Sequence, residues 1–212
     1  DQFIGGKDTW LRGASWQMER PLKDHTRSVS FRQNGVHTLG EKIVDTTISN
    51  ISSYHYGGPQ FQYSNGRYYL ATEYYWITGE RRDGYTVYDD YSAEGGSIYG
   101  QYFFNSDATV KISSKKGKIG GVKCKAKFGC TAAKFMLESI DTRDGELNGL
   151  NGTHGKAVHF GLNHYFNSNV RLMVDATRGV YLGGHNDFYS DGNRADRRHT
   201  MTSIQARLHA KF

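Results

Sequence analysis

The clearest pattern in the chain is alternation of apolar and polar residues over short segments. In the closing segment the apolar positions are every second residue, namely Ile204, Ala206, Leu208, Ala210 and Phe212, with polar or basic residues between them. A period of two places successive side chains on opposite faces of a strand. These segments therefore predict β-strands with one apolar face, and the sequence shows no convincing amphipathic helix.

Alternation and turn residues together predict about nine strands, each roughly 9 to 13 residues long. They cover residues 10–19, 27–36, 53–63, 68–80, 93–104, 130–141, 156–166, 169–182 and 200–212, and residues 43–51 are a candidate for one more. A tilted strand of this length can cross a membrane. Short connections also alternate with long polar ones, which is typical of barrels with tight periplasmic turns and long extracellular loops. We therefore predict an all-β fold, an antiparallel transmembrane β-barrel of about 9–10 strands forming a single domain over residues 1–212.

Composition supports a barrel but leaves alternatives open. The chain has 15 Tyr, 11 Phe, 3 Trp and 26 Gly but only 2 Pro, and aromatic residues near the predicted strand ends would form interface girdles. No stretch approaches the roughly 18 consecutive apolar residues of a membrane-spanning helix, which excludes a helical membrane protein. Two other classes remain: a structural or adhesive outer-membrane barrel, and a soluble β-sandwich that binds acidic polymers.

Positive charge is concentrated in one segment. The net charge is +6, and residues 113–128 hold six lysines and no acid, so the rest of the chain is balanced. We predict a Lys-rich loop over residues 105–129, which is either solvated surface or an anion site. The candidate anion-binding and pore-lining residues are these lysines and the basic residues on polar strand faces: Lys115, Lys116, Lys118, Lys123, Lys125, Lys127, Arg32, Lys134, Arg171, Arg207 and Lys211.

Cys124 and Cys130 are the only cysteines and lie within the basic segment. A disulfide between them would close a local turn in an oxidising compartment, whereas two buried free thiols are the alternative. No further ligands with metal-site spacing lie nearby, so we predict no metal.

Catalysis is not predicted. Histidines and acids are present, but no nucleophile motif such as G-x-S-x-G occurs. We therefore expect neither an enzyme nor a cofactor.

An odd strand count predicts that further strands belong to the barrel. If the tight turns are periplasmic, Phe212 ends at the periplasm and the first of nine strands begins outside, whereas bacterial barrels usually have an even number of strands. The sequence is therefore expected to be the C-terminal portion of a longer porin, unless residues 43–51 form an additional strand.

Several segments resemble, in the same order, the C-terminal half of the phosphate-selective porins of the O/P type. They are "WLRGASWQME", "KIVDTTISNISSYHYGGPQF", "GRYYLATEYYWI", "GGSIYGQYFF", "GKIGGVKCK", "AAKFMLESIDTRDGELNG", "VHFGLNHYFNSNVRLMVDATR" and "IQARLHAKF", of which "FGLNHYFNSNVRLMVD" is the most specific. The lysines of "KKGKIGGVKCKAK" match a basic family segment, whereas the two cysteines depart from the family pattern.

The resemblance implies a porin of the outer membrane of a Gram-negative bacterium, with about sixteen strands in the whole barrel. It implies a homotrimer that passes small anionic solutes such as phosphate through a water-filled channel. The expected partners are outer-membrane lipid, lipopolysaccharide and these solutes, and not nucleic acid. Phe212 resembles the terminal aromatic residue that the outer-membrane assembly machinery recognises.

Overall fold

The computed structural model describes residues 2–5, 8–20, 27–34, 42–83, 86–105, 108–113, 118–142, 154–182 and 198–210. The regular structure of this part of the chain consists of strands, as the alternating pattern predicts. The strands are β1 (Gln2–Gly5), β2 (Asp8–Glu19), β3 (Arg27–Asn34), β4 (Lys42–Ser64), β5 (Tyr68–Asp83), β6 (Thr86–Phe103), β7 (Ala108–Ser113), β8 (Lys118–Cys124), β9 (Cys130–Asp141), β10 (His154–Tyr165), β11 (Val170–Leu182) and β12 (Arg198–Ala210).

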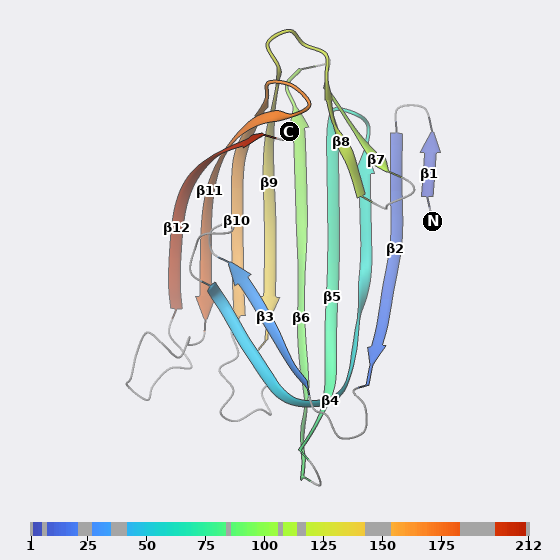
Figure 1. Ribbon diagram of the computed structural model, residues 1–212, viewed down its shortest axis with the longest axis vertical. Coiled ribbons are helices and arrows are strands. Elements are labelled where there is room, and N and C mark those ends of the chain that lie inside the picture. The colour runs from blue at the N-terminus through green and yellow to red at the C-terminus, as the bar shows by residue number, and fades with distance from the viewer. Residues whose placement is uncertain are drawn as a thin grey trace.

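One curved antiparallel sheet contains ten of these strands (Figure 1). Its order is β1-β2-β4-β5-β6-β9-β10-β11-β12, and β3 pairs with the first half of β4. β7 and β8 form a separate two-stranded sheet. The sheet forms a curved antiparallel wall, and among the described strands β1 and β12 do not pair to close it.

β4 joins two segments that the sequence pattern separates, residues 43–51 and 53–63, into one strand from Lys42 to Ser64. Its pairing with β5 shifts register between Ile51 and Ser53. Such a bulge bends a strand, and the first half of β4 crosses the hollow side of the sheet toward β10 (Figure 1).

Tight turns join neighbouring strands at one end of the sheet, here called the short-turn end. β4 leads into β5 through Gly66, whose positive φ of 91° glycine adopts without steric cost. β10 leads into β11 through Asn167, whose Oδ1 accepts hydrogen bonds from the backbone N–H groups of Asn169 (2.8 Å) and Val170 (2.9 Å). The predicted Lys-rich loop lies at the same end, and within it the described residues form the β7–β8 hairpin (Figure 1).

The outer face of the sheet carries an apolar band between two groups of aromatic residues. Large apolar side chains are exposed there, among them Leu70, Ile98, Leu137, Val158, Phe160, Leu162, Leu172, Val174, Ile204 and Leu208. Tyr68 borders the band at the short-turn end and Trp76 at the other. Tyr68 and Trp76 are eight residues apart on β5. This separation corresponds to about 27 Å of strand, or about 20 Å of membrane thickness at the usual strand tilt. The band thus matches the apolar belt of an outer-membrane barrel.

No helix in the described residues is long and apolar enough to cross a membrane.

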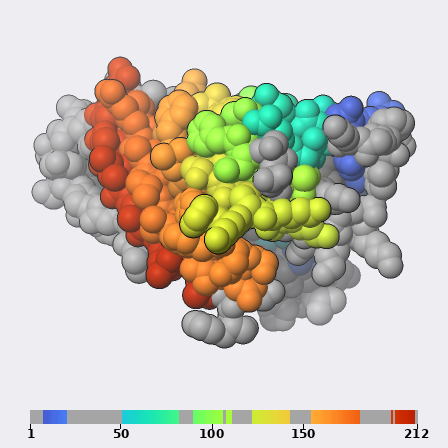
Figure 2. Space-filling view, turned by 90° about the horizontal axis from the view of Figure 1, so that it is seen from above, coloured from blue at the N-terminus to red at the C-terminus, as the bar shows by residue number. Residues whose placement is uncertain are grey.

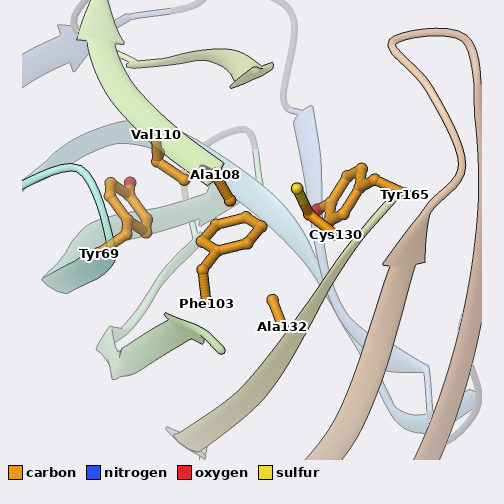
Figure 3. Close-up of a cluster of buried hydrophobic side chains, with 7 residues drawn as sticks. All are labelled: Tyr69, Phe103, Ala108, Val110, Cys130, Ala132 and Tyr165. Carbon is orange, nitrogen blue, oxygen red and sulfur yellow. The ribbon is translucent and has the colours of Figure 1, made fainter. Parts of the chain in front are cut away.

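A buried cluster fixes the hairpin to the sheet near the short-turn end (Figure 3). Phe103 of β6 faces Ala108 and Val110 of β7, and its ring centroid lies 5.8 Å from that of Tyr165 in β10. The other members of the cluster are Tyr69, Cys130 and Ala132. Because these residues point to the concave face of the sheet, the hairpin lies inside the curve.

Candidate permeation site on the concave face

An ion pair spans three neighbouring strands on the concave face. Lys134 of β9 and Asp175 of β11 both lie opposite Gly161 of the intervening β10. Lys134 Nζ lies 2.7 Å from Asp175 Oδ1 and donates a hydrogen bond to Oδ2 at 3.0 Å. A Cβ atom on Gly161 would lie 2.1 Å from Asp175 Oδ1, so the missing side chain provides the space that the ion pair occupies.

A second polar layer crosses the same strands two residues farther from the short-turn end. His159 of β10 bridges its two neighbours: Nε2 is hydrogen-bonded to Glu138 Oε1 at 3.1 Å and Nδ1 to Thr177 Oγ1 at 2.8 Å. Glu73 of β5 also faces inward and accepts a hydrogen bond from Ser97 Oγ at 3.2 Å. The acidic side chains of the concave face therefore lie mostly away from the short-turn end.

A third layer, nearer the short-turn end, consists of buried amides and phenols. Gln101 Nε2 and Asn163 Nδ2 donate hydrogen bonds to the Tyr165 hydroxyl at 3.3 and 3.4 Å. Tyr99 donates to Gln101 Oε1 at 3.0 Å. Asn163 is only 4% exposed and its Oδ1 has no hydrogen-bond partner.

The first and third layers border a cavity of about 460 Å³ on the concave face. Arg171 of β11 and Arg207 of β12 line it beside the Lys134–Asp175 pair, together with His209. Arg171 Nε is buried without a hydrogen-bond partner. Three cationic side chains and one carboxylate belong to the described lining, so it carries more positive than negative charge.

The β7–β8 hairpin covers the cavity from the short-turn end. Val122 of β8 contributes to the lining, and Figure 2 shows the end of β8 and the following turn lying over the curved sheet when it is viewed from above. Val110 binds the β4–β5 turn, because its N–H donates to Gly66 O (2.8 Å) and its carbonyl accepts from Ser64 Oγ (2.7 Å). A disulfide between Cys124 and Cys130 joins the end of β8 to the start of β9.

Comparison with protein families identifies this arrangement. The family described as phosphate-selective porin O and P matches residues 47–212, which is well over half of the chain. The chain belongs to this porin family. Searches of curated proteins and of solved structures gave no significant match. Family membership is that of an outer-membrane porin, and it favours a channel over an enzyme.

Three predicted site residues of the porin meet at the cavity. Lys134, Arg171 and Arg207 come from three different strands and line the same space. Lys134 forms an ion pair with Asp175 at 2.7 Å. Asp175 is the one carboxylate among the described lining residues, so this lining carries more positive than negative charge.

The described lysines of the basic segment lie outside the cavity lining of the porin. Lys123, Lys125 and Lys127 are exposed, and Lys127 Nζ lies 5.7 Å from the centroid of the Phe128 ring. They are thus near the short-turn opening rather than against the wall. Arg32 and Lys118 belong to β3 and β8, but their side chains, together with Lys115, Lys116 and Lys211, lie outside the described residues.

Sequence patterning did not single out the neutral and acidic residues of this porin site. Tyr99, Gln101, Asn163, Asp175 and His209 line the cavity with the predicted basic residues. The alternation of apolar and polar residues places Asn163 and Asp175 on the polar faces of their strands. This pattern is the sequence signal that could have identified them. No group of three His, Cys, Asp or Glu residues suited to a metal ion occurs in the described part of the porin.

Proposed function

We propose that this porin forms a water-filled pathway along its concave face that passes small anions, such as phosphate, in preference to cations. The observation that supports it is the charge of the described cavity lining, in which Lys134, Arg171 and Arg207 face a single carboxylate, Asp175. Arginine presents several donors to phosphate or carboxylate oxygens. An excess of positive charge beside an aqueous path concentrates anions and excludes cations.

The basic segment would extend this field to the short-turn opening. The described lysines at residues 123, 125 and 127 are exposed there, and mobile ammonium groups attract anions without holding them tightly. At the opposite end Glu73 and Glu138 lie on the same face. The anion selectivity of the pathway is therefore set in the cavity beneath the β7–β8 hairpin and not by the concave face as a whole.

The outer face supports placement in the outer membrane of a Gram-negative bacterium, in contact with lipid and lipopolysaccharide. Ile204 is 79% exposed and Leu208 66%, and both lie within the apolar band. A soluble sandwich would expose polar residues there. The proposal also includes assembly as a homotrimer, which the family resemblance implies.

Reversal potentials in planar bilayers under a potassium chloride gradient test the anion preference. We expect Arg171→Gln with Arg207→Gln to lower the ratio of anion to cation permeability about twofold to fivefold, because two positive charges are removed from the cavity lining. Glu138→Gln removes an acid from the same face and should change the ratio in the opposite direction. Arg178→Gln, on the outer face, is the matched control. A cation-preferring wild type, or arginine variants that behave like the control, would refute the proposal.

A further inference from the structure

The end of the β7–β8 hairpin presents a row of lysines to water. Apolar and basic residues alternate over residues 122–127, and the apolar ones pack against the buried cluster that fixes the hairpin. The basic ones therefore share the opposite side, where all three are exposed. Figure 2, which views the molecule from the short-turn end, shows this segment on the side that faces the viewer. Its basic residues, here called the lysine row, are Lys123, Lys125 and Lys127.

The charge of the lysine row is not balanced by acids nearby in the chain. Residues 108–137 contain no Asp or Glu. Within the described part of the chain, none of the three ammonium groups has a carboxylate partner. Neighbouring like charges repel one another, so carboxylates from a second molecule would be attracted to this row.

Phe128 adds an apolar contact at the end of the lysine row. Its side chain is 83% exposed and lies in a tight turn, in which the N–H of Gly129 donates to the carbonyl oxygen of Ala126 at 3.1 Å. Lys127 Nζ lies 5.7 Å from the centroid of the Phe128 ring, so the ring continues the row. Aromatic residues are enriched where proteins bind one another. Attraction of a small anion, in contrast, requires no exposed ring.

The lysine row is held in place before any partner binds. The disulfide between Cys124 and Cys130 joins it to the start of β9. A Cβ atom on Gly129 would lie 2.3 Å from the carbonyl oxygen of Tyr165, so the turn packs closely against the end of β10. A surface that is already ordered loses little conformational freedom on binding.

The spacing and position of the row distinguish an acidic protein segment from other anionic partners. Alternate side chains of an extended chain lie about 7 Å apart, so alternate carboxylates of an extended acidic segment match the lysines in spacing. A single phosphate ion meets only one or two of the ammonium groups at a time. The hairpin lies inside the curve of the sheet, whereas a lipid surface would contact the outer face.

We propose that the lysine row and Phe128 form a docking surface for an acidic segment of a soluble protein. The segment binds at the short-turn opening, with alternate carboxylates on the lysines and an apolar side chain on Phe128. This docking surface goes beyond the proposed anion pathway and does not depend on it.

A fluorescein-labelled peptide with glutamates at alternate positions and one central leucine is the probe. Its binding to the folded porin in detergent micelles is measured by fluorescence anisotropy, and heat-dependent gel migration checks that each variant is folded. Replacing all three residues of the lysine row by glutamine should weaken binding about tenfold or more, because the ion pairs are lost. Lys156→Gln removes an exposed lysine from β10, outside the row, and should leave the affinity unchanged.

The role of Phe128 is tested with a second peptide, in which serine replaces the leucine. Phe128→Ser should weaken binding of the leucine peptide about fivefold and leave that of the serine peptide unchanged, because only the leucine contacts the ring. Phe104→Ser removes another exposed ring, one that contacts Tyr102, and is the matched control. An equal effect of Phe128→Ser on the two peptides would refute the apolar contact.

Three outcomes would overturn the docking surface. The wild-type porin could fail to bind the leucine peptide, or could bind it as tightly as the triple glutamine variant does. Free glutamate or inorganic phosphate could displace the peptide at the same concentration as unlabelled peptide does, which would indicate a site for small anions. The lysine and Phe128 variants could lose binding to vesicles containing anionic lipid while keeping the peptide, which would assign the row to the membrane.

The docking surface and the anion pathway can fail separately. Anion-selective reversal potentials without peptide binding retain the proposed function and refute the docking surface. Peptide binding by a channel without anion selectivity retains the docking surface and refutes the proposed function.

Discussion

Gly161 illustrates how a single missing side chain can organise the concave face. It lies between Lys134 and Asp175 in the strand register, and an added Cβ would lie 2.1 Å from Asp175 Oδ1 and 2.6 Å from the Val174 carbonyl oxygen. The carbonyl is backbone and cannot rotate away. Any side chain at Gly161 therefore has to displace either the ion pair or the neighbouring strand.

We predict that Gly161→Ala destabilises the folded protein by about 1–3 kcal/mol, because a partly buried ion pair is broken or strained. Unfolding in urea from detergent micelles, monitored by heat-dependent gel migration, measures the loss. Gly13→Ala is the matched control, since its added Cβ would meet only the Gln60 side chain at 3.4 Å. Equal losses in the two variants would contradict the steric argument.

The alternation of residues in the sequence predicts which basic side chains line the wall, but it does not predict which of them form ion pairs. Period-two alternation predicts that Lys134, Arg171 and Arg207 share the polar side of their strands, and the structure brings them to one cavity. That Asp175 neutralises Lys134 depends on the alignment of three strands over Gly161, which no local segment specifies. The pairing of Lys134 with Asp175 therefore follows from the sheet and not from any local segment.

Among the elements, the β7–β8 hairpin and the short strand β1 were not predicted from the sequence. The few apolar residues of the hairpin, such as Val110 and Val122, are separated by lysines and glycines, so the segment was predicted as a loop. Its position depends on contacts distant in sequence: Val110 pairs with Gly66 and packs against Phe103. β4 likewise reads as two segments because its bulge interrupts the alternation near Ile51.

We predict that replacing both Cys124 and Cys130 by serine loosens the hairpin without unfolding the sheet. A disulfide across so short a loop adds limited global stability, and the contacts of Val110 with the β4–β5 turn remain. Faster amide hydrogen exchange at Val110 and greater open-channel current noise are the expected readouts. Thiol reduction of the wild type should reproduce both, and unchanged exchange in the variant and the reduced protein would show that packing alone holds the hairpin.

At the scale of the whole molecule, the two faces of the sheet require opposite surroundings. The outer face presents exposed Phe160 and Leu162, whereas the concave face presents the ion pair and the cavity. This arrangement suits a sheet with hydrocarbon on one side and water on the other. Aromatic residues at Tyr68 and Trp76 mark the limits of the apolar side.

We predict that Leu162→Arg makes folding into lipid vesicles less favourable by about 2–4 kcal/mol. This is the cost of a cation on the lipid face near the membrane centre. Thr200→Arg places the same residue on the outer face of β12, beyond the apolar band, and should cost about 1 kcal/mol or less. Urea titrations of vesicle-folded protein measure both. Similar costs at the two positions would mean that the outer face does not contact hydrocarbon.

The ion pair over Gly161 also constrains the dimensions of the channel. Moving β10 by one residue would place Phe160 or Leu162 between Lys134 and Asp175, on the aqueous side. The pair therefore holds β9, β10 and β11 in one alignment. In a closed barrel, the stagger between strands and their number together determine the diameter. Two side chains that meet at 2.7 Å thus help to set the width of the channel as well as its charge.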